Sequence, residues 1–485
     1  MTPLRLLSVA SEIYPLVKTG GLADVAGALP AAMAREDIAV TTLVPGYPAI
    51  MAALTGGDVV LDLPMLMGGP AVVRRGTAAG LDLLVLDAPA LFDRPGNPYL
   101  GPDGRDWADN AIRFAALARV AADIARGAVA DWVPDVVQAH DWQAALVPAY
   151  LHYDGEPHPP VVLTIHNLAF QGRFPPYLLG ALGFPAEAYA LDGLEYYGDI
   201  AFLKAGLLFA DHITTVSPSY AVEIRTEAGG MGLSGLLSGR AADLTGILNG
   251  IDIEEWNPAT DNRIAARFDR DSMTARGANK RALQRMFGLA EEEDALLVGV
   301  VSRLTGQKGM DLMLAALPDL LAAGGQLALL GSGDAALEDA LRALSALHPT
   351  QVGCRIGYDE DLAHGIQAGS DALLVPSRFE PCGLTQLCAL RYGAVPIVAW
   401  VGGLADTVVN ANPVALHRGV ATGIQFQTDS VDALLAALGQ AITLFADKAA
   451  WQRIQANAMA TDVSWTLPAQ QYAELFRALV AGSSI

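Results

Sequence analysis

A chain of 485 residues exceeds the size at which a single hydrophobic core stops growing, so two domains are expected. Its 52 Asp and Glu residues outnumber its 31 Lys and Arg residues, and the formal net charge is -21, with no run of basic residues anywhere. A surface of this sign repels polyanions, and we expect neither nucleic acid nor a membrane as partner. An anionic ligand would need a few well-placed cations and backbone N–H groups.

The cysteines and the apolar segments indicate a soluble cytoplasmic protein. Cys354, Cys382 and Cys388 have neither C-x-x-C nor Cys/His metal spacing, so we expect no metal, and a reducing compartment fits best. The N-terminal apolar stretch is too short for a signal peptide. The most apolar segment, residues 312–330, is interrupted by Pro318 and by a pair of glycines, which argues against a membrane span.

Short runs rich in Val, Leu and Ile alternate with longer Ala/Leu-rich stretches of helical period. This alternation predicts an α/β fold built on parallel sheets. In the first half the predicted strands are Leu4–Ala10, Ala39–Val44, Asp135–Ala139, Val161–Ile165 and His212–Val216, with extra strands between residues 59 and 88. In the second half they are Leu296–Ser302, Gln326–Leu330, Gln351–Ile356, Ala372–Pro376 and Pro396–Ala399. Residues 249–280 show little apolar periodicity and are expected to be a linker.

Ligands of open α/β sheets bind where loops leave the carboxyl ends of strands, so these loops hold the candidate site residues. The first loop contains Lys18, Gly20 and Gly21. Paired glycines let the backbone approach a ligand and present N–H groups at a helix start, and Lys18 adds a positive charge. Neither a Walker loop nor G-x-G-x-x-G is present. Taken alone, the segment fits a surface lysine before a glycine turn equally well.

Two further loops of the second half carry charged residues. Arg303 and Lys308 follow its first strand, and two cations in one loop of an acidic protein suit a diphosphate, although two solvated side chains would look the same. Glu380 precedes Pro381, which suits a first helical position. We therefore expect Glu380 near a helix N-cap, with N–H groups from Gly383 onward able to hold phosphate oxygens. Helix capping alone would also explain Glu380.

Two histidines end predicted strands of the first half. His140 and His166 each follow an apolar run, at the depth where a ligand would meet the sheet. A single histidine there is more often structural, but two favour a site. Residues 359–361, Asp-Glu-Asp, are expected to cap the next helix rather than to bind a metal.

Together these segments resemble the glycogen and starch synthases of the bacterial and plastid type. The run Lys18–Leu22 is the most diagnostic, and the stretches 302–309 and 380–386 match two other strong motifs of that family. The segments 140–142, 164–167, 248–252 and 331–334 also fit, in the family's order. The resemblance covers essentially the whole chain.

The resemblance implies a GT-B architecture, with two Rossmann-like doubly wound domains facing a deep cleft. Residues 1–252 would form the first domain, joined by a C-terminal crossover helix within residues 465–485, and residues 253–464 the nucleotide-sugar domain. It also implies the transfer of glucose from ADP-glucose to the non-reducing end of an α-1,4-glucan, glycogen or a malto-oligosaccharide. Anomeric configuration would be retained, and neither a metal nor a cofactor would take part.

Site roles follow from the same motifs. Arg303 and Lys308 would stabilise the diphosphate leaving group, and Lys18 and Gly21 would reach the same phosphates. Glu380 would lie by the donor sugar and His166 near its 6-hydroxyl. Supporting contacts are implied for Asp141 and Asn249, adenine stacking for Tyr358 and acceptor stacking for Tyr99. The remaining substrate-binding positions implied by the motifs are Gly20, Asp24, Gly331, Cys382, Gly383, Leu384 and Thr385.

The sequence departs from the family at one glycine pair. Many relatives carry a small hydroxyl residue before this pair, where this chain has Trp400 and Val401, so phosphate contact is expected only from the backbone N–H groups of Gly402 and Gly403.

Other functions stay open. A GT-B transferase using UDP-glucose or another acceptor is the nearest, and a sugar-binding protein without turnover has no need of four charged site residues. An NAD-dependent dehydrogenase is disfavoured by the missing glycine fingerprint.

Overall fold

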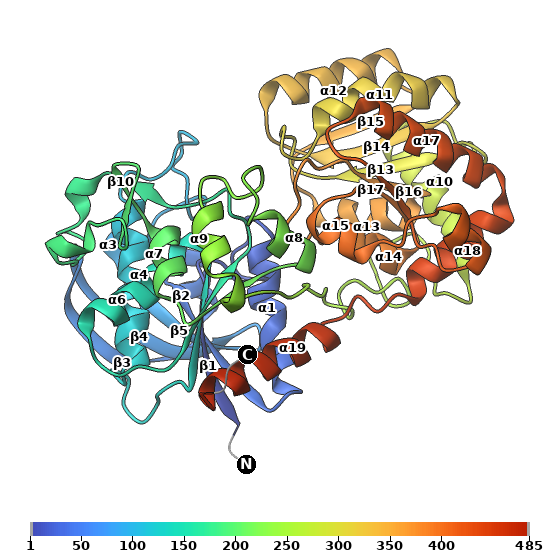
Figure 1. Cartoon of the computed structure of the whole chain (residues 1–485). Helices are drawn as coiled ribbons and strands as arrows, with labels where there is room; N and C mark the ends of the chain where they lie inside the picture. Colours follow the sequence, from blue (N-terminus) through green and yellow to red (C-terminus); the bar gives the residue numbers. More distant parts are fainter. Residues whose placement is uncertain (1–2, 483–485) are drawn as a thin grey trace. The chain divides into compact units, whose positions relative to one another are not determined.

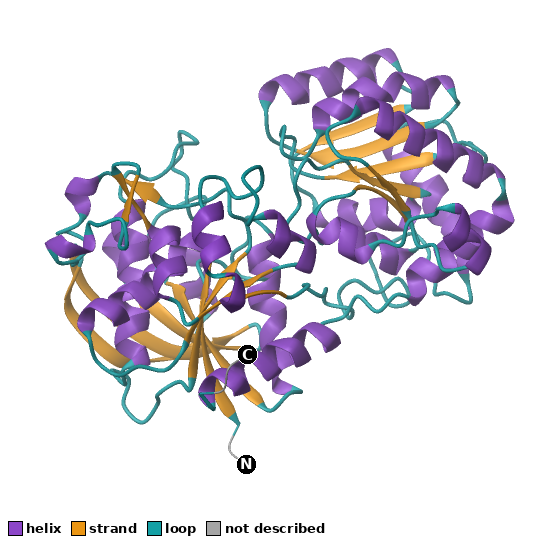
Figure 2. Cartoon of the chain, in the orientation of Figure 1, coloured by secondary structure: helices purple, strands orange, loops and turns teal. Residues whose placement is uncertain are grey.

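The computed structural model describes residues 3–482, which divide into two compact units. Unit 1 comprises the chain up to Asn249 together with the segment from Trp465 onward, and unit 2 is Gly250–Ser464. In each unit the strands form a central layer with helices packed on its faces (Figure 1, Figure 2). The predicted fold class, α/β with doubly wound sheets, is confirmed.

Unit 1 contains a nine-stranded sheet in the order β12-β11-β7-β6-β1-β2-β5-β4-β3. Its strands are β1 (Leu4–Val9), β2 (Ile38–Pro45), β3 (Thr55–Leu66), β4 (Gly69–Ala78), β5 (Leu81–Asp87), β6 (Val136–His140), β7 (Val161–Ile165), β11 (His212–Thr215) and β12 (Leu244–Gly246). All neighbours from β12 to β5 pair in parallel, whereas β3 and β4 add an antiparallel edge. The parallel strands follow the Rossmann order, and the order reverses between β1 and β6.

The helices of unit 1 cover both faces of this sheet. They are α1 (Gly21–Ala34), α2 (Pro48–Ala53), α3 (Pro89–Phe92), α4 (Asn110–Ala125), α5 (Asp141–Ala144), α6 (Leu146–Asp154), α7 (Phe202–Phe209), α8 (Pro218–Glu223), α9 (Ser234–Gly239) and α19 (Thr466–Val480), with 3-10 turns η1 (Pro176–Leu178), η2 (Ala186–Ala188) and η3 (Ala241–Asp243). A small antiparallel sheet joins β8 (Arg173–Phe174), β10 (Asp199–Ala201) and β9 (Glu195–Tyr196). Helix α4 is alanine-rich and almost wholly buried, because small side chains let it lie close to the sheet and to its neighbours.

Unit 2 has a six-stranded, all-parallel sheet in the order β15-β14-β13-β16-β17-β18. Its strands are β13 (Leu297–Val301), β14 (Gln326–Gly331), β15 (Val352–Ile356), β16 (Ala372–Val375), β17 (Val395–Ala399) and β18 (Ile424–Phe426). The central strands β13, β16 and β17 are continuous apolar runs because both of their faces are covered. This is again the Rossmann order, and it reverses between β13 and β16.

The helices of unit 2 are α10 (Arg276–Phe287), α11 (Met310–Ala322), α12 (Ala335–Leu347), α13 (Glu360–Gly369), α14 (Thr385–Tyr392), α15 (Gly402–Thr407), α16 (Pro413–Arg418), α17 (Val431–Ala446) and α18 (Lys448–Ala460), with one 3-10 turn, η4 (Met273–Ala275). Five of them begin at a side chain that accepts a hydrogen bond from the first turn, a contact that fixes the start of the helix. These caps are Asp334, Asp359, Asn412, Ser430 and Asp447. The predicted capping role of the Asp359 segment is thus confirmed.

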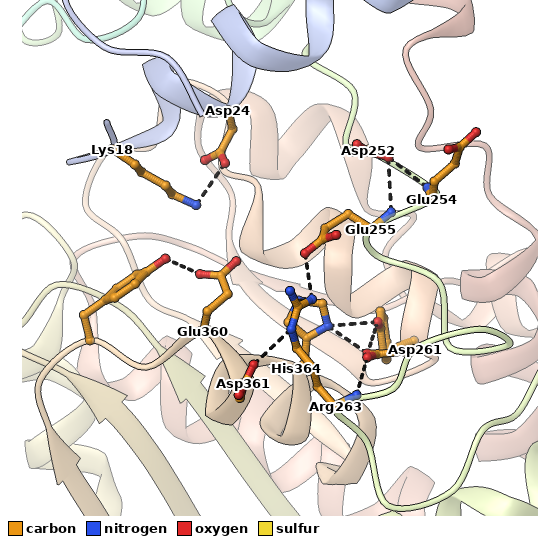
Figure 3. A network of polar contacts seen from close by, with 12 residues as sticks. Lys18, Asp24, Asp252, Glu254, Glu255, Asp261, Arg263, Glu360, Asp361 and His364 are labelled. Atoms are coloured by element: carbon orange, nitrogen blue, oxygen red, sulfur yellow. Dashed lines mark hydrogen bonds and ion pairs between the residues drawn. The ribbon is translucent and has the colours of Figure 1, made fainter. Parts of the chain in front are cut away.

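The segment predicted to be a linker is instead packed onto unit 2. Asp261 and His364 are buried and hydrogen-bonded at 2.7 Å, and Tyr392 donates to the same carboxylate at 2.6 Å. Trp256 stacks on His364 with ring centroids 3.8 Å apart. The prediction was wrong here because buried polar contacts such as Asp261–His364 (Figure 3) and scattered apolar residues, Ile264 and Phe268 among them, hold the segment without a regular apolar period.

The C-terminal helix α19 belongs to the core of unit 1. Tyr472 and Phe476 are fully buried in an apolar cluster with α1, β1 and β2, and Arg477 donates to the backbone oxygen of Glu36 at 2.5 Å. Helix α19 therefore completes the core of unit 1.

Among residues 3–482, no single helix is long and apolar enough to cross a membrane. The consecutive helices α17 and α18 reach the required length and hydropathy only together, and they are bent by 108° at the break between them. Over the same residues, no group of three or more His, Cys, Asp or Glu side chains could hold a metal ion.

Phe476→Ala should lower the stability of unit 1 by about 3–5 kcal/mol, because it removes a fully buried ring. The measurement is native-state hydrogen exchange at β1 and β2. Leu467→Ala in the same helix is the matched control, since that side chain is 60% exposed, and it should cost less than about 1 kcal/mol. Equal effects of the two variants would show that α19 does not stabilise the unit.

Candidate functional site

In unit 2 the predicted charged residues lie where the strand order reverses. Arg303 and Lys308 lie in the loop after β13, and Glu380 lies in the loop after β16. Because β13 and β16 are adjacent parallel strands, their carboxyl ends open at the same edge of the sheet. Ligands of doubly wound sheets bind at such reversal points.

The central contact of this edge joins Lys308 to Glu380. Lys308 Nζ donates to both carboxylate oxygens of Glu380, at 2.8 and 2.6 Å, and Ser377 Oγ donates to the second oxygen at 2.8 Å. The side chains of Lys308 and Glu380 are only 18% and 9% exposed. A pair this buried is stable only while both partners are present, since removing one leaves an uncompensated charge.

Close backbone packing makes that contact possible. Gly309 has φ of +66°, and a Cβ at this position would overlap the carbonyl oxygen of Pro376. The backbone N–H of Arg378 donates to the carbonyl oxygen of Gln307 at 2.9 Å. The loop after β13 can therefore lie directly on the loop after β16 only because residue 309 is glycine.

Arg303 stands apart from this pair. It is exposed, and its side chain makes no hydrogen bond or ion pair with any residue between 3 and 482. The loop that carries it packs against the loop after β14: Leu304 N–H donates to Ser332 at 2.9 Å, and a Cβ at Gly331 would overlap the oxygen of Ser302. The predicted residue Gly331 is thus a close-approach position that holds the Arg303 loop.

Glu380 is not a helix cap, which corrects the sequence prediction. Helix α14 begins at Thr385 and its N-cap is Leu384, so Pro381 lies outside it. Gly383 has φ of +74°, and this left-handed residue turns the chain into the helix. The carboxylate of Glu380 is held instead by Lys308, a partner 72 residues away that local pattern does not reveal.

The Gly402–Gly403 pair packs against the loop that carries Glu380. The N–H of Gly403 donates to the carbonyl oxygens of Glu380 and Pro381, both at 3.2 Å. A Cβ on either glycine would overlap the backbone of Glu380 or Cys382. The Gly403 N–H is therefore engaged by the Glu380 loop, and the two glycines support that loop.

Tyr358 lies at the rim of a cavity of about 480 Å³ in unit 2. Its side chain is 74% exposed and its hydroxyl donates to the Glu360 carboxylate. Arg263 and Asp361 line the same cavity and are ion-paired at 3.0 Å, with Glu255 on the other side of Arg263 at 2.6 Å (Figure 3). An exposed ring beside a polar-walled cavity is suited to a flat heterocycle.

In unit 1 the site residues gather at the corresponding reversal between β1 and β6, and on the adjacent strand β7. His140 is fully buried, with Nε2 3.2 Å from Ser8 Oγ and Nδ1 2.9 Å from Nε2 of His166. Burial lowers the pKa of His140 to about 4. Burial, and then the neighbouring His140, holds the pKa of His166 well below its ordinary value. Both rings are therefore neutral near pH 7.

One ring nitrogen of His166 is engaged by His140, and the other is not. Its Nε2 is paired with His140, whereas Nδ1 has no hydrogen-bond partner among residues 3–482. Asp141 fixes the backbone of the same loop by accepting from the N–H of His166 at 2.7 Å and of Asn167 at 3.3 Å. A neutral imidazole suits a sugar hydroxyl, which donates and accepts equally well.

Asp141 is a buried carboxylate in a strained backbone conformation, with φ of +53°. Its pKa is raised to about 7, chiefly because the carboxyl group is buried. The hydrogen bonds from the two backbone N–H groups lower the pKa, and the nearby Glu12 carboxylate raises it. Strain and shifted acidity of this kind concentrate at functional sites.

Glu12, which the sequence analysis did not single out, organises the glycine loop after β1. Its carboxylate accepts from the backbone and the hydroxyl of Thr19 and from the hydroxyl of Tyr99. The ring of Tyr99 is partly buried and lies 5.8 Å from Phe114, so its contacts are with the protein. The sequence held one signal for this role: Glu12 is a charged residue in the loop that follows an apolar strand.

The remaining predicted residues of unit 1 occupy the edges of this group. Lys18 Nζ donates to Asp24 at 2.9 Å, and both side chains are about one quarter exposed (Figure 3). Gly20 is the N-cap of α1, which begins at Gly21. Asn249, the last residue of unit 1, is 8% exposed, and its buried Oδ1 has no partner among residues 3–482. An unsatisfied buried acceptor of this kind is available to a ligand.

Known proteins match the chain over its whole length. Residues 5–239 match the family model of the starch synthase catalytic domain, and residues 284–457 that of the glycosyl transferases group 1. A glycogen synthase of Rhodopseudomonas palustris (strain BisB18) is 61% identical over 481 residues, 99% of this chain and 98% of that protein. A glycogen synthase of Acidiphilium cryptum is 60% identical over 478 residues, 99% and 100% of the two chains.

Solved structures agree with these relatives. The catalytic domain of Starch Synthase IV from Arabidopsis thaliana, bound to ADP and acarbose, superposes with a TM-score of 0.89 at 32% identity and covers 99% of this chain and 100% of its own. Sucrose-phosphate synthase from Thermosynechococcus elongatus has a TM-score of 0.60 at 17% identity, with 99% and 100% coverage, which is a likeness of fold alone.

Gly309→Ala should destabilise unit 2 by more than about 2 kcal/mol and reduce any activity that uses Lys308, because the methyl group separates the two loops. Thermal unfolding and enzyme assay measure the two effects. Gly306→Ala, in the same loop with no heavy atom within 4 Å of the added carbon, should stay within about 0.5 kcal/mol. A tolerated Gly309→Ala would contradict the close-packing argument.

Asp141→Asn should gain stability over wild type as pH rises. Between the unfolded pKa of 3.8 and the folded value of about 7 the folded chain retains a proton that the unfolded chain releases. Wild-type stability therefore falls through this window, whereas an amide has no such dependence. Urea unfolding should show the variant gaining about 2–3 kcal/mol over wild type between pH 5 and pH 8. The exposed Asp58→Asn is the control, and a pH-independent difference would refute a neutral Asp141.

Proposed function

This chain belongs to the glycogen synthase family, and from that premise we propose that it transfers glucose from ADP-glucose to the non-reducing end of an α-1,4-glucan. ADP is released and the anomeric configuration is retained. The fold is the two-domain GT-B fold of glycosyltransferases. The names of the relatives and the ADP and acarbose bound to the starch synthase support the choice of donor and acceptor.

One observation carries the proposal: Lys308 is held on Glu380 at the reversal point of the unit 2 sheet, and the same loop after β13 carries the exposed Arg303. Negative charge develops on the departing diphosphate as the glycosidic bond breaks, and preorganised cations stabilise this charge. Arg303 supplies a planar fork of donors and Lys308 a point charge. Because a diphosphate leaves as a stable anion, the reaction needs no general acid at this position.

Glu380 orients the sugar or stabilises positive charge rather than attacking the anomeric carbon. A retaining glycosidase uses one carboxylate of a pair as nucleophile. In this chain both oxygens of Glu380 already accept hydrogen bonds, two from Lys308 and one from Ser377. Three of the roughly four lone-pair positions of the carboxylate are engaged, which weakens Glu380 as a nucleophile. Front-face attack, with the leaving phosphate accepting the proton of the acceptor hydroxyl, is consistent with this arrangement.

The contacts of unit 1 suit the neutral parts of the substrates and the phosphates. We assign His166 Nδ1 and the Asn249 side-chain oxygen to sugar hydroxyls, and Lys18 with the N–H groups at the start of α1 to phosphate oxygens. Tyr358 and its cavity are assigned to the adenine ring. A neutral glucan also agrees with a chain of net charge -21.

A cytoplasmic location is part of the same proposal. Cys354, Cys382 and Cys388 are all free thiols, and two of them are buried. Free cysteines fit a reducing compartment.

The decisive assay follows nucleotide release from ADP-glucose and from UDP-glucose, each with and without glycogen. Release should depend on glycogen and be faster with ADP-glucose, and Glu380→Ala should abolish most of it. Faster release from UDP-glucose would support the alternative donor. Release that ignores the acceptor, or an unimpaired Glu380→Ala, would reject the transferase assignment.

Lys308→Gln should lower turnover by about 100-fold, because the amide keeps a donor for Glu380 but removes the charge from the leaving group. The KM for glycogen should change less than threefold. Lys448→Gln, which removes an exposed lysine paired with Asp294 in the same unit, should behave as wild type. A defect confined to glycogen binding would contradict the phosphate role of Lys308.

A further inference from the structure

Arg378 ties together the two loops that carry Lys308 and Glu380. Its Nη1 donates to the carbonyl oxygen of Gly306 at 2.6 Å, and its backbone N–H donates to Gln307 at 2.9 Å. The guanidinium also forks onto Asp311, with two bonds of 2.7 Å, and Nε donates to Asp429 at 2.8 Å. One side chain in the Glu380 loop thus holds the turn before Lys308.

The arrangement is more rigid than a single surface ion pair. An isolated exposed pair contributes little to stability, but a bidentate arginine fork has fixed geometry and loses less freedom when it binds. Asp311 lies in the first turn of α11, where the helix dipole favours a carboxylate. Hydrogen bonds from Arg378 hold the pKa of Asp311 below its ordinary value, so the pair stays ionised near pH 7.

The fork contacts the turn that carries Lys308. Thr305–Gly309 is a tight turn closed by Lys308 N–H to Thr305 at 3.1 Å and Gly309 N–H to Gly306 at 3.1 Å. Across the turn, the Gly309 backbone lies against Pro376. Arg378 adds side-chain contacts at Gly306 and Asp311, one on each side of Lys308. The position of the lysine ammonium is thereby determined on both flanks.

We propose that Arg378 is a positioning residue for the transfer reaction: its fork on Gly306 and Asp311 holds the Lys308 turn so that the ammonium group reaches Glu380 and the departing diphosphate. Arg378 does not touch substrate and acts through Lys308. This inference rests on the proposed function, since it assigns a second residue to the same step. No step of the chemistry uses Arg378 directly.

The first test compares Arg378→Ala with Arg342→Ala. Arg342 also pairs with two carboxylates in unit 2, Glu338 and Asp339, but both lie on its own helix α12. Arg378→Ala should lower kcat about 10- to 100-fold, because small misplacements of a catalytic group have effects of this size. The KM for ADP-glucose should change less than threefold, and the melting temperature should fall no further than in Arg342→Ala. Arg378→Lys should recover only part of kcat, because lysine cannot form the fork.

The second test asks whether Arg378 acts through Lys308. In the double variant Arg378→Ala/Lys308→Gln, kcat should fall little further than in Lys308→Gln alone, since a displaced turn no longer carries a charge to misplace. Full multiplication of the two losses would overturn the proposal, as would a kcat of Arg378→Ala within twofold of wild type. Wild-type turnover of ADP-glucose in the same assay tests the proposed function separately.

Discussion

The buried contact between Lys308 and Glu380 is the constraint on which the unit 2 site depends. Two opposite charges with exposures of 18% and 9% must meet across loops 72 residues apart, because either one left alone would be an uncompensated buried charge. The surrounding backbone shows how the sequence meets this requirement. Gly309 has no side chain where Pro376 approaches, and Gly402 and Gly403 let another loop support Glu380 from behind. A glycine pair in a loop is a typical phosphate-binding feature, but in this unit the glycines allow close contact between loops.

The two units have the same strand topology, but their candidate residues differ in charge. In each one the strand order reverses beside the first strand, and the loops at that point carry the candidate residues. In unit 2 the loop after β13 carries the exposed cation Arg303 as well as Lys308, which is paired with Glu380. Unit 1 presents two neutral histidines and an aspartate whose pKa of about 7 reflects burial.

Most of the strands and several candidate residues could be predicted from the sequence, for physical reasons. The long parallel strands are apolar runs buried on both faces, so their period and glycine-ended turns predicted them well, whereas β12 and β18 are three residues long and were missed. The charged residues that follow strands could also be picked out as candidates from the sequence. The residues that these side chains contact could not be predicted in the same way. The Lys308–Glu380 contact, the Arg378 fork and the Asp261–His364 pair join residues 72, 67 and 103 positions apart, and no local pattern encodes such distances. The proline after Glu380 predicts a helix start at that position, whereas the helix starts at Thr385.

The account's central claim is that Lys308 and Glu380 act as one unit in the transfer step, and a double-mutant cycle on kcat tests it most directly. The four enzymes are wild type, Lys308→Gln, Glu380→Gln and the double variant, each assayed with saturating ADP-glucose and glycogen. If the pair acts as a unit, the double variant should lose little more activity than the worse single variant. Two losses that multiply in full would show that the residues act independently, and would contradict the account.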